Sequence, residues 1–317
     1  MTAAPEPTPR SQTLRLLALE AALTEIVPHL RRRGIEAMLL KGAGTARWLY
    51  DTVADRRYGD IDLLVPSGSM EVAIAALAEL GFESEWPTGR ADGAGRHHEV
   101  LVRHGLPEVV VELHRTLDLV PARAAAVWQQ LTADADSIEL AGTAITVPSA
   151  PAALFIVAIH AAQHGVRSAK PLRDLDAAAA RAAPEAWRGA AALAGELGAG
   201  PAFTAGLRLT AAGGEIADRL GLPAAPAVSR EVALKARSAP ETALGIELLV
   251  TTPGVAARAR LLAGKAFPSP EWMRHWRPLA RRGRLGLACA YLVRPLWLLA
   301  KLPRGARAWR RAARGDD

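Results

Sequence analysis

The chain is poor in cysteine and in long apolar runs. Cys289 is the single cysteine among 317 residues, which excludes an internal disulfide framework and any zinc site built from several cysteines. A reducing, cytoplasmic setting is therefore expected. The N-terminal stretch lacks a basic region followed by an apolar core, so no secretory signal is expected. No uninterrupted apolar run reaches the roughly 18 residues typical of a membrane-spanning helix.

Acidic residues are missing from one long stretch near the C-terminus. From Arg274 to Arg314 the sequence contains twelve Lys/Arg and no Asp/Glu. The residues before Arg274 carry 27 Lys/Arg against 30 Asp/Glu, although the whole chain has a net charge of +7. The basic character therefore belongs to this segment, and no stable nucleic-acid complex is expected of the protein as a whole.

The residues that are present predict a folded α+β protein. Hydrophobic residues make up 50% of the chain and charged residues 22%, which suits a protein with an ample core. Residues 11–147 predict a small α/β domain with a mixed sheet. Residues 148–270 are rich in alanine and leucine at helical spacing, and predict a helical domain. Residues 271–317 form a basic, partly amphipathic C-terminal segment.

Helices and strands alternate in the predicted α/β domain. Helix-spaced apolar residues run from Ser11 to about Arg33, where Gly34 is expected to end the helix. A strand is then expected at residues 35–40, followed by a helix through about Asp51 and a second strand at 57–65. After a helix that ends at Gly81, two further strands are expected at residues 97–103 and 108–113.

Two aspartates begin the apolar stretch RYGDIDLLV. On a strand, Asp60 and Asp62 project to the same side, while Ile61 and Leu63 face a core on the other side. Two carboxylates held this close repel each other unless a cation lies between them, and Mg²⁺ is commonly bound by one or two carboxylates together with substrate phosphates. An Asp-x-Asp at a strand start is, taken alone, also typical of plain turn and capping chemistry.

A third acid lies in the apolar stretch VVVELHR. Glu112 stands between Val111 and Leu113 on an expected strand. If this strand lies beside the strand of Asp60 and Asp62, three carboxylates converge. Such a set is suited to metal-dependent phosphoryl or nucleotidyl transfer.

The order of these elements resembles that of a known family. LLKGAGTARWLY, DRRYGDIDLLV, VVVELH and a helical stretch with HAAQH together resemble the uncharacterised nucleotidyltransferases, a family of the DNA polymerase β-like nucleotidyltransferase superfamily. The resemblance covers about residues 14–270. It implies that Asp60 and Asp62 are the metal-binding pair and that Glu112 is the third acid. It also implies Mg²⁺ or Mn²⁺ as cofactor and an NTP, with ATP expected, as co-substrate.

One position departs from the superfamily pattern. The Gly-Ser turn is here Gly42-Ala43, so the serine hydroxyl that meets the triphosphate is missing. Thr45 is a candidate replacement. The distance along the chain from Gly42 to Asp60 is also longer than in compact members of the superfamily.

Several residues near this turn are candidates for nucleotide binding. Lys41 precedes Gly42 and Gly44, whose backbone N–H groups can approach an anion at the start of the following helix. Lys41 is expected to hold the β- and γ-phosphates. Arg56 matches the family arginine four residues before the first aspartate, and either binds triphosphate or pairs with Asp60 or Glu112. A solvated lysine next to a turn is the plain alternative for Lys41, and Arg57 is expected at the surface.

Further residues are candidates for the acceptor side of the site. By strand alternation His114 faces the same side as Glu112, where it either orients Glu112, contacts substrate or is structural. His160 and His164 share one helix face, but with no glutamate in the pattern and no cysteine nearby a zinc site is disfavoured. Lining of a cleft, together with Arg173 and Asp174, is the alternative.

The C-terminal stretch 284–314 leaves three interpretations open. Its apolar part has basic flanks and is interrupted by Arg294 and Pro295, which makes it a poor spanning helix. It attaches peripherally to an anionic membrane, docks an acidic partner, or packs on the body of the protein with a solvated basic face.

The leading hypothesis is a metal-dependent nucleotidyltransferase that moves NMP from an NTP to a hydroxyl or phosphate of an acceptor and releases pyrophosphate. The resemblance implies a small molecule, sugar or peptide of a biosynthetic pathway as acceptor. One alternative is a toxin-like enzyme that modifies protein or tRNA. Another is a catalytically inactive scaffold or binding protein, which the missing serine favours.

Overall fold

The computed structural model describes residues 9–85 and 97–314. The chain divides into two compact units, which we call the sheet unit (Met1–Ala161 with Ala169–Pro226) and the C-terminal unit (Ala162–Ser168 with Ala227–Asp317). The division of the sequence after residues 147 and 270 stays a prediction. The N-terminal residues considered for a secretory signal lie partly outside the described residues.

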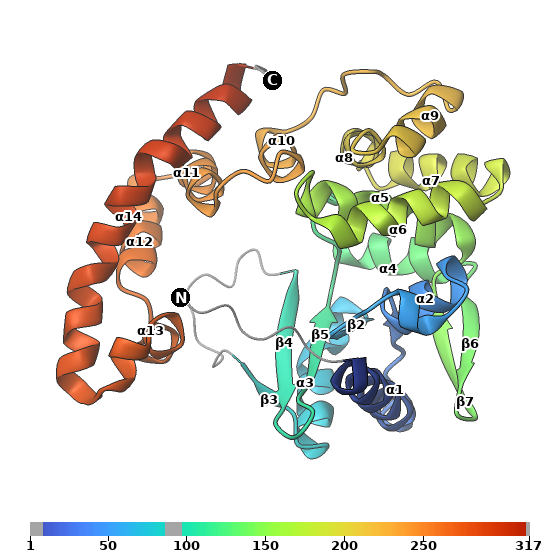
Figure 1. Ribbon diagram of the computed structural model, residues 1–317, viewed down its shortest axis with the longest axis horizontal. Helices are drawn as coiled ribbons and strands as arrows, with labels where there is room; N and C mark the ends of the chain where they lie inside the picture. Colours follow the sequence, from blue (N-terminus) through green and yellow to red (C-terminus); the bar gives the residue numbers. More distant parts are fainter. Residues whose placement is uncertain (1–8, 86–96, 315–317) are drawn as a thin grey trace. The chain divides into compact units, whose positions relative to one another are not determined.

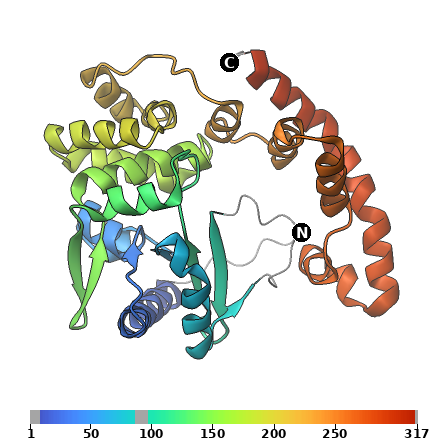
Figure 2. The same ribbon diagram turned by 180° about the vertical axis from the view of Figure 1, so that it is seen from behind.

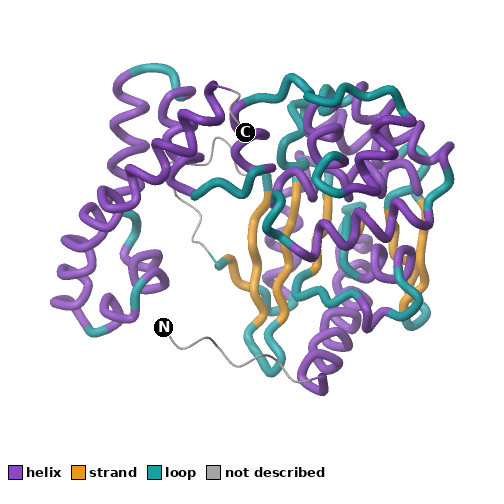
Figure 3. The backbone as a smooth tube through the Cα atoms, turned by 45° about the horizontal axis from the view of Figure 1, so that its top comes forward, coloured by secondary structure: helices purple, strands orange, loops and turns teal. Residues whose placement is uncertain are grey.

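Seven strands of the sheet unit form one mixed sheet (Figure 3). In spatial order the strands are β3 (Glu83–Ser84), β4 (His98–Arg103), β5 (Val109–His114), β2 (Ile61–Leu64), β1 (Met38–Leu39), β7 (Thr143–Val147) and β6 (Asp136–Leu140). The pairs β2–β5 and β1–β7 are parallel, and the other neighbours are antiparallel. The α+β class predicted from the sequence is confirmed.

One face of this sheet carries the main apolar core. The helices α1 (Pro9–Arg32) and α3 (Met70–Glu79) pack there, near the bottom of Figure 1. Ile61 and Leu63 of β2 are fully buried in this core, as their alternation with the aspartates predicted. Gly34 and Gly81 follow the two helices with φ of 69° and 80°, the left-handed conformation that ends helices. The opposite face of β2 and β5 is therefore left for polar side chains.

The sequence interpretation missed part of the sheet. β6 and β7 form a hairpin whose two-residue turn has φ of 44° at Ala141 and 78° at Gly142. Positive φ at both central residues suits the right-handed twist of a hairpin, but Ala-Gly is not among the usual sequence signals for it. The short strand β3 and the helix α4 (Ala124–Thr132) were also not expected.

Helices make up the rest of the sheet unit, as expected after residue 148. Along the chain, the short helix α2 (Ala43–Leu49) and the 3-10 turn η1 (Val53–Asp55) come between β1 and β2, and the 3-10 turn η2 (Ser67–Ser69) comes between β2 and α3. The later helices are α5 (Ala150–His164), α6 (Ala169–Arg181), α7 (Pro184–Glu196), α8 (Gly200–Leu207) and α9 (Ala211–Arg219). They lie together as a group, away from α1 and α3 (Figure 1).

The C-terminal unit is built along one long helix. Its elements are α10 (Arg230–Ala236), α11 (Glu241–Thr251), α12 (Val255–Ala266), α13 (Pro270–Trp276), η3 (Pro278–Arg281) and α14 (Gly283–Arg314). The others lie along one side of α14 (Figure 2). We expected Arg294 and Pro295 to interrupt the apolar stretch, yet the helix continues through both. By length and composition alone, α14 could cross a membrane.

Candidate functional site

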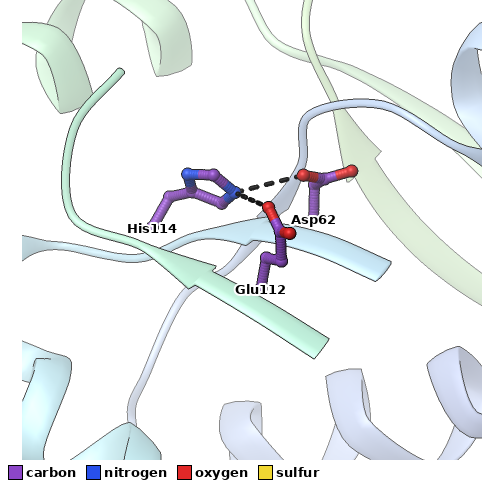
Figure 4. Close-up of side chains that lie close together, drawn as sticks. All are labelled: Asp62, Glu112 and His114. Carbon is purple, nitrogen blue, oxygen red and sulfur yellow. Dashed lines mark hydrogen bonds and ion pairs between the residues drawn. The ribbon is translucent and has the colours of Figure 1, made fainter. Parts of the chain in front are cut away.

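The parallel pairing of β2 and β5 brings acids from distant parts of the chain together. In the register of the two strands Asp62 lies opposite Glu112, and His114 follows on the same side of β5. Ligand atoms of these three side chains all lie within 4.8 Å of one another. Figure 4 shows them converging on one point. They form the one group within residues 9–85 and 97–314 whose geometry suits a metal ion.

Asp62 is buried between two basic side chains. Its Oδ1 lies 3.0 Å from Lys41 Nζ and 3.1 Å from His114 Nε2, and only 2% of the residue is exposed. Burial alone would raise the pKa of Asp62, but Lys41 and His114 lower it well below its usual value. The sequence interpretation expected a cation beside these carboxylates, and for Asp62 the side chains of Lys41 and His114 supply positive charge. A metal ion bound by Asp62 stays a prediction.

The pKa values of the two basic partners of Asp62 are shifted as well. Burial lowers the pKa of Lys41, but Asp62, Glu112 and Asp60 together raise it, and the net direction is upward. Burial likewise lowers the pKa of His114, whereas its hydrogen bonds to Asp62 and Glu112 raise it above the usual value. The acids around both side chains therefore favour their charged forms.

Glu112 is the more open member of the group. Its Oε2 lies 3.5 Å from His114 Nε2, and 28% of its side chain is exposed. The hydrogen bond from His114 lowers the pKa of Glu112. The ring of His98, on β4, lies 5.0 Å from the ring of His114, and burial together with the positive charge of His114 lowers the pKa of His98. His98, to which the sequence assigned nothing, thus borders the site.

Asp60 lies at the start of β2 and is half-buried. Burial and the charge of Asp62 raise its pKa, while Lys170 on α6 lowers it. Asp60 is not in the group that the described ligand atoms form, so its predicted metal contact stays a prediction. The half-buried Lys170, which the sequence interpretation missed, has its pKa lowered by burial and then by Arg56. An ammonium group beside ionised acids is a candidate phosphate contact.

The glycine turn before α2 lies against the same segment. Gly42 has φ of 70° and ψ of −119°, a conformation that side chains disfavour, and an added Cβ would lie 3.6 Å from the Asp60 carbonyl oxygen. Gly44 and Thr45 follow in the first turn of α2, which spans seven residues. Among the described residues of this turn, Lys41 has a side-chain contact to an acid of the site, Asp62.

Arg56 pairs with Asp174 and not with Asp60 or Glu112 as one interpretation held. Its Nε and Nη2 donate to the two Asp174 carboxylate oxygens at 2.9 and 2.7 Å, and its Nη1 donates to the Gly42 carbonyl at 3.2 Å. The Tyr50 hydroxyl also donates to Asp174, at 2.7 Å. Arg56 and Asp174 are 3% and 2% exposed. Their place in the structure is thus that of a buried brace that holds the glycine turn to α6.

Hydrogen bonds to α1 hold the rest of the segment that leads to Asp60. The Tyr58 hydroxyl donates to Glu20 at 2.9 Å, and Arg15 donates to the Gly59 carbonyl at 2.9 Å. Arg47 of α2 binds both oxygens of Glu20, at 2.9 and 3.0 Å. The backbone around the two aspartates is therefore fixed from both sides, which favours a preorganised site.

The remaining acceptor-side candidates are not members of this group. His160 is half-buried on α5, and His164 is exposed at the end of that helix, where its carbonyl accepts a hydrogen bond from Ser238. Arg173 is exposed on α6, unlike its neighbour Asp174. Within the described residues, neither histidine enters a group suited to a metal ion. Their roles on the acceptor side stay predictions.

Together these features define an α+β protein with a buried carboxylate–lysine–histidine cluster on one face of a mixed sheet. The model of a family described as uncharacterised nucleotidyltransferase matches residues 9–212. This match covers more than half of the chain and includes every residue of the cluster, so the chain belongs to that family.

Two further comparisons complete this result. A crystal structure of an antigenic nucleotidyltransferase-like protein from Paracoccidioides brasiliensis is similar to this chain, with 18% sequence identity and a TM-score of 0.38 over 56% of this chain and 88% of that one. A comparison with curated proteins finds no match.

Proposed function

We propose that the protein is a metal-dependent nucleotidyltransferase that moves NMP from an NTP to a hydroxyl or phosphate of an acceptor. The observation that carries this proposal is the pairing of β2 with β5, which sets Asp62 opposite Glu112 beside Lys41. The family supports the reaction class, since its description names nucleotidyltransferases.

The donor set fits a hard divalent cation. Carboxylate oxygens are the ligands that Mg²⁺ and Mn²⁺ prefer, and Asp62 and Glu112 offer them within 4.8 Å of each other. Asp60 is the third expected ligand. Lys41 and His114 contact the same Asp62 oxygen, so a cation bound by Asp62 would replace these contacts. When bound, the ion would neutralise charge on the triphosphate and polarise the α-phosphate.

The protein's own groups then have distinct tasks. Lys41 and Lys170 bind phosphate oxygens, and the Gly42 turn approaches the triphosphate with its backbone. A bond forms between the acceptor oxygen and the α-phosphorus as the bond to the bridging oxygen breaks, and pyrophosphate leaves with the electron pair. The proton of the acceptor passes to a Glu112 oxygen, which His114 holds in place. We expect a small molecule, sugar or peptide as acceptor and ATP as nucleotide.

The protein's own cations also keep the inactive-scaffold alternative open. Because Lys41 and His114 neutralise Asp62, the acids persist at low cost without any metal. Gly42-Ala43 in place of Gly-Ser points the same way. The two functions differ in whether a nucleotide binds in a metal-dependent way.

Thermal unfolding with each NTP, with Mg²⁺, Mn²⁺ or chelator, tests the proposal. The variants are Asp60→Asn/Asp62→Asn and a matched control, Asp134→Asn/Asp136→Asn, which changes a second, exposed Asp-x-Asp of the same unit. We expect saturating nucleotide and metal to raise the Tm of the wild type and the control by about 5 °C. The site variant should lose this rise.

Label transfer from α-labelled NTP in lysate separates the remaining alternatives. Label on a small molecule, sugar or peptide supports the proposed acceptor class, and label on protein or tRNA supports the toxin-like alternative. The absence of both a metal-dependent rise in Tm and any transfer of label would contradict the proposal and favour the scaffold.

A further inference from the structure

One side of α14 exposes a row of leucines. Leu285, Leu292, Leu296 and Leu299 are 84%, 73%, 66% and 62% exposed. Their spacing of seven, four and three residues places them on one side of the helix, and we call this row the apolar stripe. The opposite side of α14 packs against α10, α11, α12, α13 and η3. The apolar stripe is therefore not part of the packing of the C-terminal unit.

The charged side chain within the length of the apolar stripe, that of Arg294, faces the interior of the C-terminal unit. Arg294 is 8% exposed, and its guanidinium carbon lies 4.4, 4.6 and 5.0 Å from the ring centroids of Trp272, Trp276 and Trp297. These aromatic faces stabilise the buried cation. Between Arg284 and Lys301 the helix has no other charged residue, so its outward side is uncharged over this length. The interruption expected from the sequence does not reach the surface.

Basic residues follow the apolar stripe. Exposed side chains of α14 beyond Lys301 include Arg304, Arg307, Arg310, Arg311 and Arg314, which we call the basic end. α14 contains no Asp or Glu at all. An exposed apolar row joined to clustered arginines matches a surface that is both apolar and negatively charged.

The dimensions of α14 suit binding at the surface of a bilayer better than a helix that spans it. The apolar stripe extends over residues 285–299, about 21 Å of helix. The hydrocarbon core of a bilayer is about 30 Å thick, so the stripe is too short to cross it. In addition, a span would strip α14 of the helices packed along its other side. Parallel pairing of two copies through this stripe would bring their basic ends together. Antiparallel pairing would bring each basic end to the exposed Arg281, Arg282 and Arg284 of the other copy, so like charges oppose self-association either way.

We infer that α14 docks the protein on an anionic lipid bilayer. The apolar stripe enters the boundary between headgroups and acyl chains, and the basic end binds the anionic headgroups. The site on the sheet unit is independent of this docking, so the inference holds whether or not the chain transfers nucleotides.

Sedimentation of the full chain with preformed vesicles tests the inference. Vesicles of phosphatidylcholine alone are compared with vesicles that contain about one-third phosphatidylglycerol. We expect binding to the anionic vesicles that is about tenfold or more tighter, that weakens with added salt and that alkaline carbonate reverses. Equal binding to both vesicle types, or resistance to carbonate, would overturn the inference.

Matched variants separate the two parts of the surface. Leu292→Glu/Leu296→Glu should abolish sedimentation, whereas Leu14→Glu/Leu17→Glu, an equal change at leucines of α1 that are 52% and 59% exposed, should keep it. Arg304→Gln/Arg307→Gln/Arg310→Gln should weaken binding to anionic vesicles about tenfold. Unchanged binding of the α14 leucine variant contradicts the inference.

The single cysteine supplies a direct probe. Cys289 is exposed four residues after Leu285 and three before Leu292, beside the apolar stripe. A polarity-sensitive dye on Cys289 should shift its emission to the blue with anionic vesicles only. No shift, together with a dimer in light scattering that Leu292→Glu/Leu296→Glu abolishes, would show that a second copy covers the stripe. No shift, together with capture by an acidic protein, would assign the surface to such a partner.

Discussion

The sheet unit and the C-terminal unit bury their apolar side chains to very different extents. One core cluster of the sheet unit joins 27 buried residues, whereas the cluster around Met273 in the C-terminal unit joins three. Of the seventeen exposed large hydrophobic side chains among the described residues, thirteen lie in the C-terminal unit.

The charges differ in the same way. The sheet unit pairs its buried charges with opposite ones, as in Arg56–Asp174 and Lys41–Asp62. The C-terminal unit buries Arg294 against aromatic rings, half-buries Arg230 in a pair with Glu247, and leaves most of its other arginines on the surface. A chemical site needs side chains fixed by a dense shell, which only the sheet unit provides. The C-terminal unit has instead the composition of a surface for another partner.

The largest effect should come from breaking the brace of the sheet unit. Arg56→Ala leaves the buried Asp174 carboxylate without its guanidinium partner, and we expect the free energy of unfolding to fall by about 3–5 kcal/mol. Chemical denaturation measures this loss. Arg181→Ala, which removes a pair with Asp51 at the surface, should cost less than about 1 kcal/mol. Similar losses in the two variants would show that the buried pair is not a structural brace.

A smaller loss of stability is expected within the C-terminal unit alone. Arg294→Ala removes the cation from three tryptophan rings and leaves a void in the small cluster of that unit. We expect a loss of about 2 kcal/mol. Calorimetry should show one transition at lower temperature and the transition of the sheet unit unchanged, while Arg304→Ala at the surface should shift neither. A uniform shift of all unfolding would show that the two units are not separately cooperative.

A variant of Lys170 tests the substrate binding that the proposed function requires. Lys170→Gln removes an ammonium group close to Asp60, and the KM for NTP should rise about tenfold, or about 1.4 kcal/mol, with kcat little changed. Steady-state kinetics measures both constants. Lys265→Gln, an exposed lysine of the C-terminal unit, is the matched control and should change neither. A fall in kcat without a change in KM would assign Lys170 to another role.

Strand alternation and one strand pairing were enough to predict that Asp62 and Glu112 lie together, whereas Asp60, the third predicted carboxylate, is outside the group that the structure forms. Asp62, Glu112 and His114 lie on two short strands, so a period of two decides which side they face. The partners of these residues could not be predicted in this way. Asp174 is 118 residues from Arg56, on a helix whose packing against the sheet no local pattern records.

The fold shows the same limit. α1 and α3 were predicted from periodicity and from the glycines that end them. The β6–β7 hairpin was missed because its turn places an alanine at positive φ, where asparagine or glycine is the usual signal. In α14 the sequence showed an arginine within an apolar run, but only the tryptophans packed around it decide that Arg294 faces inward.

The smallest effect concerns Asp60, and its sign is opposite to that of Arg56. Burial and the charge of Asp62 raise the pKa of Asp60, so the ionised carboxylate destabilises the folded state at neutral pH. Asp60→Asn keeps the shape and removes the charge. In chelator at neutral pH we expect the Tm to rise by a small amount, on the order of 2 °C.

The pH dependence of this gain follows from the direction of the shift. The penalty of the wild type is fully present above the raised folded pKa and is absent below the unfolded pKa, where the carboxyl is neutral in both states. The advantage of Asp60→Asn should therefore disappear as the pH falls below 3.8, the unperturbed pKa of the aspartate. Mg²⁺ with nucleotide should reverse the order at neutral pH, because only the wild type then gains a ligand. A variant less stable than the wild type in chelator would show that Asp60 has a stabilising partner in the folded chain.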